Sequence, residues 1–203
     1  MIILLLMLGC LKAEDFSLKG DKMFIRDKGN VYVLEKNVEF QRQSTYLKAD
    51  NADWNKDKDI FQARGSVYFL VKDTGTELEG SGSWAQYSGR EQKMWIKKID
   101  RIKYNYDVAK GSGTVIVTGE EGEVDSERDE ANVRGIPVLM NTDEWEAAGE
   151  RLIYTKDKLH LVAMNYLRSL TSSFYFEADT LFFYPDQERI VLKGKVRGTI
   201  PVY

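Results

Sequence analysis

The chain has 203 residues, of which 43% are hydrophobic and 12% aromatic, enough for a sizeable core in one elongated domain or two small ones. Its formal net charge is -3 and its pI is about 5.4, so no overall basic field exists to hold a nucleic acid by counterion release. Gly is frequent (16) and Pro is scarce (3), while β-branched and aromatic residues dominate the apolar set, which predicts strands and argues against disorder.

The first segment, Met1 to Leu8, is wholly apolar and is too short to span a bilayer, which needs about 20 residues. An apolar run followed by small residues is typical of a secretory signal peptide, although the usual basic start is missing. Cleavage after Ala13 predicts a signal peptide of residues 1–13. Alternatively, Met7-Leu8-Gly9-Cys10 resembles an imperfect lipobox, so that residues 1–9 are removed and a lipid on Cys10 tethers the protein to a membrane. An uncleaved anchor is the third interpretation, and all three predict export across the inner membrane.

The remainder of the chain repeats one strand-turn-strand unit. The first copy contains Ala49-Asp50-Asn51-Ala52-Asp53-Trp54-Asn55-Lys56-Asp57, with an acid, an aromatic and a final Asp at fixed positions. Copies with the same spacing begin at Ile99, Gly149 and Ala178, which are 50, 100 and 129 residues further along. The fourth copy continues through the return strand, because the glycine at Gly65 recurs at Gly194 with apolar residues at matching positions around it. Weaker copies begin at Gly20 and Gly82, 29 residues before and 33 residues after Ala49, so the unit is about 29 to 33 residues long, a length within the range of structural repeats.

Within the first unit, apolar and polar residues alternate with a period of two, which is typical of a half-buried strand. The alternation slips between Ala49 and Ala52, as it does at a bulge that bends a strand from one sheet layer to another. Residues 55–58 predict a turn, and the stretch from Phe61 to Phe69 predicts the returning strand. Several such units predict an elongated all-β structure, either a jelly roll or a solenoid-like sandwich, with an apolar inner face and two open sheet edges.

These motifs resemble the OstA-like repeats of the LptA-LptC family of periplasmic lipopolysaccharide-transport proteins. The resemblance rests on residues 37–40, 47–55 and 63–67 and on the related segment from Phe176 to Val196. It implies that residues 16–203 form a twisted, open β-jelly roll that shields the acyl chains of lipopolysaccharide and passes it toward the outer membrane. It also implies that such jelly rolls join end to end by strand addition. The pattern is diluted over residues 72–141, which could join two repeat-rich halves.

The apolar side of the units is the predicted lipid-binding interior. Burying about ten carbons of an acyl chain there contributes roughly 8 kcal/mol before ordering costs. Its predicted members are Val38, Phe40, Leu47, Ala49, Ala52, Trp54, Phe61, Ala63, Val67, Tyr104, Val115, Val117, Trp145, Leu152, Tyr154, Leu161, Phe174, Phe176, Leu181, Phe183, Ile190 and Leu192. Lys97, Lys98, Arg101 and Lys103 are candidates for phosphate contacts at the rim, although a solvated strand face is the simpler interpretation.

Other chemistry-bearing residues have structural explanations. Asp57, Asp107, Asp157 and Asp186 recur in every copy, which indicates turn residues and not a catalytic site. His160 is the sole histidine and is predicted to point to solvent, so neither a nucleophilic triad nor a histidine metal site is expected. We therefore expect no enzyme activity and no cofactor. Transport of lipopolysaccharide or a similar amphiphile is the first hypothesis, a structural envelope protein that assembles through strand edges without lipid binding is the alternative, and a glycan hydrolase is a distant third.

Overall fold

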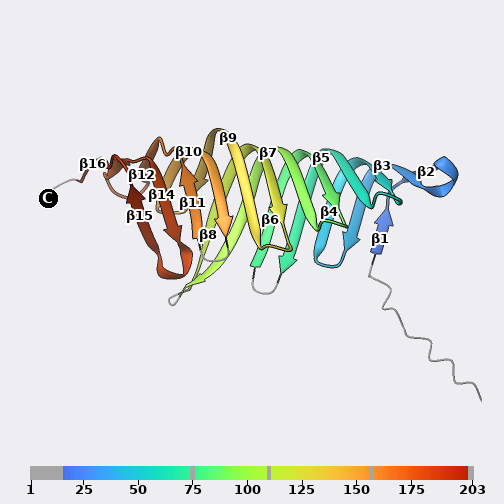
Figure 1. Cartoon of the computed structure of the whole chain (residues 1–203), viewed down its shortest axis with the longest axis horizontal. Helices are drawn as coiled ribbons and strands as arrows, with labels where there is room; N and C mark the ends of the chain where they lie inside the picture. Colours follow the sequence, from blue (N-terminus) through green and yellow to red (C-terminus); the bar gives the residue numbers. More distant parts are fainter. Residues whose placement is uncertain (1–15, 74–75, 109–110, 156–157, 201–203) are drawn as a thin grey trace, which may run out of the picture.

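The computed structural model describes residues 16–73, 76–108, 111–155 and 158–200; Cys10 and Ala13, and with them the predicted leader, lie outside these residues. All described strands belong to one antiparallel sheet that winds along a long axis (Figure 1). The strands are β1 (Phe16–Lys19), β2 (Lys22–Arg26), β3 (Val31–Arg42), β4 (Thr45–Asn55), β5 (Ile60–Asp73), β6 (Thr76–Ser88), β7 (Lys93–Val108), β8 (Gly111–Asp125), β9 (Glu130–Asn141), β10 (Trp145–Thr155), β11 (Lys158–Val162), β12 (Tyr166–Ser169), β13 (Tyr175–Glu177), β14 (Thr180–Tyr184), β15 (Arg189–Lys193) and β16 (Arg197–Thr199). Two 3₁₀ helices, η1 (Asp27–Gly29) and η2 (Pro185–Gln187), occupy turns.

Every strand from β3 to β10 bends near its middle. The strand pairing shifts register at each bend, for example between Lys48 and Asn51 and between Ile99 and Ile102. At the two ends of the molecule the chain is interrupted at the bend, so that two short strands replace one long bent strand. Thus β2 pairs with the first half of β3 and β1 with the second half. Likewise β12 pairs with the first half of β10 and β11 with the second half. The bulge that the sequence predicts between residues 49 and 52 is one of these bends.

The bends divide the sheet into two facing layers. Layer A contains β1, β12, β13, β16 and the halves of β3–β10 that continue them, and layer B contains β2, β11, β14, β15 and the other halves. Phe40 of layer A stacks on Phe61 of layer B with ring centroids 4.3 Å apart, although strand β4 separates β3 from β5 in the sheet order. The layers are thus joined along the bends, and the hairpin turns lie at the opposite margin.

An acid and a glycine shape the bend in matching copies of the repeat. The Asp50 carboxylate accepts a hydrogen bond of 2.8 Å from the Ser66 backbone N–H, next to Gly65 with φ of 96°. In the fourth copy, Asp179 accepts from the Lys195 N–H at 3.3 Å, beside Gly194 with φ of 90°. The repeated acid therefore holds the bend of the neighbouring strand, which is a structural role.

The predicted all-β, elongated open jelly roll of repeated strand-turn-strand units is confirmed. The predicted turn lies one residue later than expected, at residues 56–59 and not 55–58, because β4 continues through Asn55; β5 is the predicted return strand. The diluted region 72–141 supplies the long strands β6 to β9 in the middle of the same sheet. None of the helices within the described residues has the length and apolar character needed to cross a membrane.

Candidate functional site

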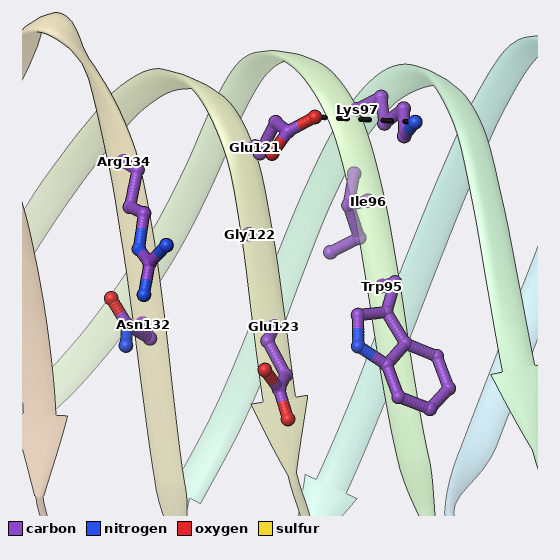
Figure 2. A pocket seen from close by; sticks show the side chains of 8 residues that line it. All are labelled: Trp95, Ile96, Lys97, Glu121, Gly122, Glu123, Asn132 and Arg134. Carbon is purple, nitrogen blue, oxygen red and sulfur yellow. Dashed lines mark ion pairs between the residues drawn. The ribbon is translucent and has the colours of Figure 1, made fainter.

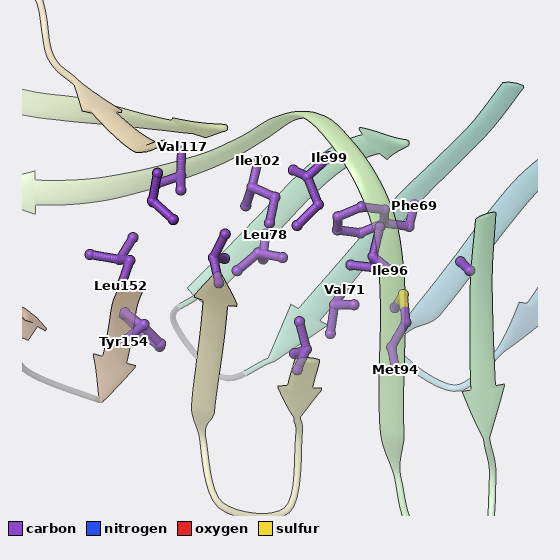
Figure 3. Close-up of a cluster of buried hydrophobic side chains, with 14 of the residues drawn as sticks. Phe69, Val71, Leu78, Met94, Ile96, Ile99, Ile102, Val117, Leu152 and Tyr154 are labelled. Atoms are coloured by element: carbon purple, nitrogen blue, oxygen red, sulfur yellow. The ribbon is translucent and has the colours of Figure 1, made fainter. Parts of the chain in front are cut away.

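The space between layers A and B is filled by one continuous cluster of apolar side chains (Figure 3). Every residue of the predicted interior lies in it. Trp54, Tyr104, Phe174, Phe176, Ile190 and Leu192 are partly buried, and all the others are buried. That these side chains contact a lipid stays a prediction.

Sequence reasoning missed many members of this cluster, chiefly in the diluted region. Met94, Ile96, Ile99 and Ile102 of β7 are buried between the layers. The signal that could have found them is local, since Met94 and Ile96 alternate with the polar or outward Trp95 and Lys97 even where the repeat motif itself has faded.

The margin where the two rows of turns meet is the mouth of this interior. Val71 and Leu78 of layer A there face Val124 and Ala131 of layer B around a cavity of about 30 Å³. A second cavity of about 30 Å³ lies deeper, against Ile102 and other apolar side chains. Each has room for little more than a water molecule, so the apolar side chains themselves fill the described interior.

Aromatic rings bridge the layers on the C-terminal side of these cavities. Tyr104 of β7 contacts Tyr154 of β10 with ring centroids 5.1 Å apart, and Tyr106 contacts Phe183 of β14 at 5.7 Å. Burial raises the pKa of Tyr104, and the neighbouring Tyr154, with which it shares a hydrogen bond, raises it further. Tyr104 therefore keeps its proton at neutral pH and contributes a neutral hydroxyl group to the mouth.

An ion pair crosses the mouth nearer the N-terminus. Arg42, at the layer A end of β3, donates from Nη1 to both carboxylate oxygens of Asp59, at 2.5 and 2.6 Å. Asp59 belongs to the β4–β5 turn of layer B, and both side chains are largely buried. We name this pair the latch, because it holds the two layers together at their open margin.

A second carboxylate, Asp125, lies beside the cavity at the mouth. Burial alone acts to raise its pKa, but the Arg128 backbone N–H and the Lys93 ammonium outweigh burial and hold the pKa below its usual value. Lys93 Nζ lies 3.2 Å from its carboxylate, and the Arg128 N–H donates to it at 3.1 Å. Asp125 is therefore an anion at the mouth, and its ion-pair and hydrogen-bond partners both belong to layer B.

The predicted head-group cations lie on the outer surface near the bend of β7, away from the mouth. Lys97 pairs with Glu121 at 4.0 Å at a polar depression of about 270 Å³ lined also by Trp95, Glu123 and Arg134 (Figure 2). Arg101 pairs with Glu79 at 3.8 Å, Lys98 is exposed and Lys103 is half-buried. Phosphate binding by these four stays a prediction.

The remaining singled-out residues are the repeated aspartates and His160. Asp57 and Asp186 occupy turns as predicted, and Asp157 lies outside the described residues. The turn predicted at Asp107 is wrong, because β7 continues through this residue, which pairs with Ser112 of β8. His160 faces outward from β11 as expected, but its ring stacks on Phe182 at 4.2 Å and its Nε2 is buried with no hydrogen-bond partner in the part of the chain that the structure describes. It is half-buried and does not point freely into solvent, because the partly apolar outer face of β14 covers it. Among the described residues, no three His, Cys, Asp or Glu side chains gather as a metal site requires.

Comparisons with known proteins add a family to this geometry. The family described as LptA/(LptD N-terminal domain) LPS transport protein matches residues 17–160. Among solved structures, the chain is similar to LptH of Pseudomonas aeruginosa, titled the LptA homologous periplasmic component of the lipopolysaccharide transport device. The two are 9% identical with a TM-score of 0.40, and the match covers 93% of this chain and 96% of that one. No curated protein sequence matches.

Proposed function

The chain belongs to the LptA/(LptD N-terminal domain) family of LPS transport proteins, and we propose that it carries lipopolysaccharide across the periplasm to the outer membrane with the acyl chains held between its two layers. The observation that carries the proposal is the apolar cluster, which runs from Leu34 near one end of the sheet to Phe183 near the other without interruption. A path for acyl chains needs such continuity, because each exposed CH₂ costs about 0.8 kcal/mol in water.

The layers part at the mouth to admit the lipid. Acyl chains then replace contacts between Val71, Leu78 and Tyr154, which line the small cavities, with contacts of the same apolar kind. Because one apolar contact replaces another, the apolar area shielded from water changes little. The polar sugars stay outside the mouth. The family is one of transport proteins, and the interior offers apolar contacts in place of catalytic groups.

Neighbouring jelly rolls extend the path by strand addition. At the N-terminal end of the described sheet, β1 and β2 form the edge, and each has one side without a strand partner. At the C-terminal end, β15 and β16 form the edge in the same way. Phe24 and Ile25 on β2 are 44% and 61% exposed, and Val196 and Ile200 at the other edge are 47% and 67% exposed. Exposed apolar side chains on an open edge favour pairing with another strand. Removal of the leader, with or without a lipid on Cys10, belongs to the same proposal.

Site-specific photocrosslinking tests the interior. A photoreactive phenylalanine replaces Phe61, which points between the layers, and in a matched variant it replaces Gln62, the next residue of β5, which points outward. In cells that make lipopolysaccharide, the Phe61 variant is expected to form the lipopolysaccharide adduct and the Gln62 variant to form little. Equal labelling at the two positions, or none at Phe61 while the protein stays folded, contradicts an interior path.

A structural protein without a lipid is the second candidate, because the interior is filled by its own side chains and leaves cavities of only about 30 Å³. Such a protein assembles through its edges with the layers shut. Absence of the Phe61 adduct together with formation of end-to-end assemblies would favour this candidate.

A further inference from the structure

The outer face of β10, β11, β14 and β15, in the orange-to-red part of Figure 1, differs from the outer face elsewhere. Its outward residues form three rows across the four strands. The middle row is Ile153, His160, Phe182 and Val191, paired from strand to strand. The rows on either side contain Arg151, Lys158, Arg189 and Lys193. None of the outward residues of β11, β14, β15 and the layer B half of β10 (residues 151–155) is acidic, although the exposed Glu150 adjoins Arg151 at the bend of β10. We name this surface the cationic face.

The cations of this face lack the carboxylate partners that several outer cations of β4 to β8 have. Cross-strand ion pairs there include Lys48–Glu39 and Lys72–Glu77, both at 3.3 Å, and Lys93–Glu123 at 3.1 Å. Lys98 and Lys103 of β7 have no ion pair within the described residues. Within the described residues, Lys158 and Lys193 have no ion pair, and Arg151 donates to the neutral amide of Asn132 at 2.9 Å. In a chain of net charge -3, four cations without carboxylate partners therefore gather on one face.

Two lysines of the outer rows lie close to the Phe182 ring of the middle row. Lys193 Nζ lies 4.9 Å and Lys158 Nζ 6.0 Å from the centre of the Phe182 ring. Burial lowers the pKa of His160, and Lys158, Arg151 and Lys193 lower it further, as expected where positive charges converge. An apolar strip between cations matches the boundary of a bilayer, where rings enter the head-group region and Lys and Arg meet lipid phosphates.

We propose that the cationic face docks the protein on the surface of an anionic phospholipid bilayer. An acidic protein is less suited to this face, because the half-buried strip of Ile153, Phe182 and Val191 offers no charge complement along its centre. The site is separate from the interior, so the inference goes beyond the transport proposal: the face would hold the rod against a membrane while the mouth handles lipopolysaccharide.

Vesicle flotation tests this docking with the purified protein. Wild type is expected to float with phosphatidylglycerol vesicles and not with phosphatidylcholine vesicles, and to detach as salt rises. Lys158→Gln with Lys193→Gln is expected to weaken binding about 30-fold, since each lysine near an anionic surface strengthens binding about fivefold. Lys72→Gln with Lys97→Gln changes the net charge equally at cations that have ion pairs, and is expected to weaken binding far less.

Thermal unfolding of both double variants checks that each folds. Failure of wild type to float with phosphatidylglycerol, or an equal loss in the two double variants, overturns the proposal. Binding of wild type to polyglutamate but not to vesicles also overturns it and assigns the face to an acidic protein. The Phe61 crosslink to lipopolysaccharide tests the interior independently of the cationic face. Absence of vesicle binding together with an intact crosslink would therefore reject membrane docking and leave the transport proposal standing.

Discussion

At the scale of single residues, the bend of the repeat depends on a glycine held against an acid. Gly65 has φ of 96°, and a Cβ added to it would lie 2.2 Å from the Asp50 carboxylate, which itself accepts the Ser66 N–H. The same arrangement recurs at Gly194 and Asp179. Each of these glycines therefore meets two constraints, a positive φ and the absence of a side chain.

Gly65→Ala is expected to destabilise the protein by about 3 kcal/mol, because the strained backbone and the displaced Asp50 add together. Gly29→Ala is the matched control: Gly29 has φ of 97°, but nothing lies within 4 Å of its added Cβ. The control is expected to cost about 1 kcal/mol from the backbone alone. Urea unfolding measures both, and equal losses would show that contact with Asp50 is unimportant.

His160 gives a prediction for pH. Its pKa is lowered, first by burial and then by Lys158, Arg151 and Lys193, the cations that face it from β11, β10 and β15. Above the ordinary value of 6.5 neither the folded nor the unfolded state is protonated, and the full stability is present. As pH falls from 6.5 toward the lowered pKa, the unfolded state takes up the proton first and stability is lost.

Urea unfolding across this pH window compares wild type with His160→Gln. The stability of wild type is expected to fall more steeply with decreasing pH, because the variant has no imidazole to titrate. Parallel curves for the two proteins would show that His160 titrates alike in both states.

At the scale of elements, the latch is the contact that we expect to resist separation of the layers. The Arg42–Asp59 pair links the end of β3 in layer A to a turn of layer B, whereas Lys48–Glu39 links neighbouring strands within layer A. Arg42→Gln is expected to lower stability by about 1 kcal/mol and to speed the uptake of fluorescent lipopolysaccharide. Lys48→Gln, the control, is expected to leave uptake unchanged. Stopped-flow fluorescence measures the rates, and a slower or unchanged uptake in Arg42→Gln would assign opening to another part of the mouth.

Sequence reasoning predicts what depends on local pattern. Period-two alternation and the slip after Ala49 predict the strands, the inner face and the bend, since each is a property of one strand and its neighbour. The latch escapes such reasoning, because Arg42 and Asp59 meet only after the bends have folded layer A over layer B. His160 escapes it in part, since alternation gives its face but not the Phe182 ring that covers it.

At the scale of the whole molecule, a bent repeat that adds one strand after another produces a rod with an interior along its length (Figure 1). Such a rod ends in open edges however many repeats it contains. Transport over a greater distance then requires either more repeats or the joining of rods. The apolar residues at both edges favour joining.

Joining through the edges leads to the last prediction. Ile25→Lys places a charge on β2, where Ile25 is 61% exposed, and is expected to reduce concentration-dependent oligomers because a lysine on an open edge opposes strand pairing. Ile136→Lys makes the same change on β9 in the middle of the sheet, where Ile136 is 82% exposed, and is expected to leave assembly unaltered. Sedimentation velocity over a concentration series reads both variants. Equal loss of oligomers would point to general charge repulsion, whereas loss in Ile25→Lys alone places the contact at the edge and so keeps the interiors of successive rods in line.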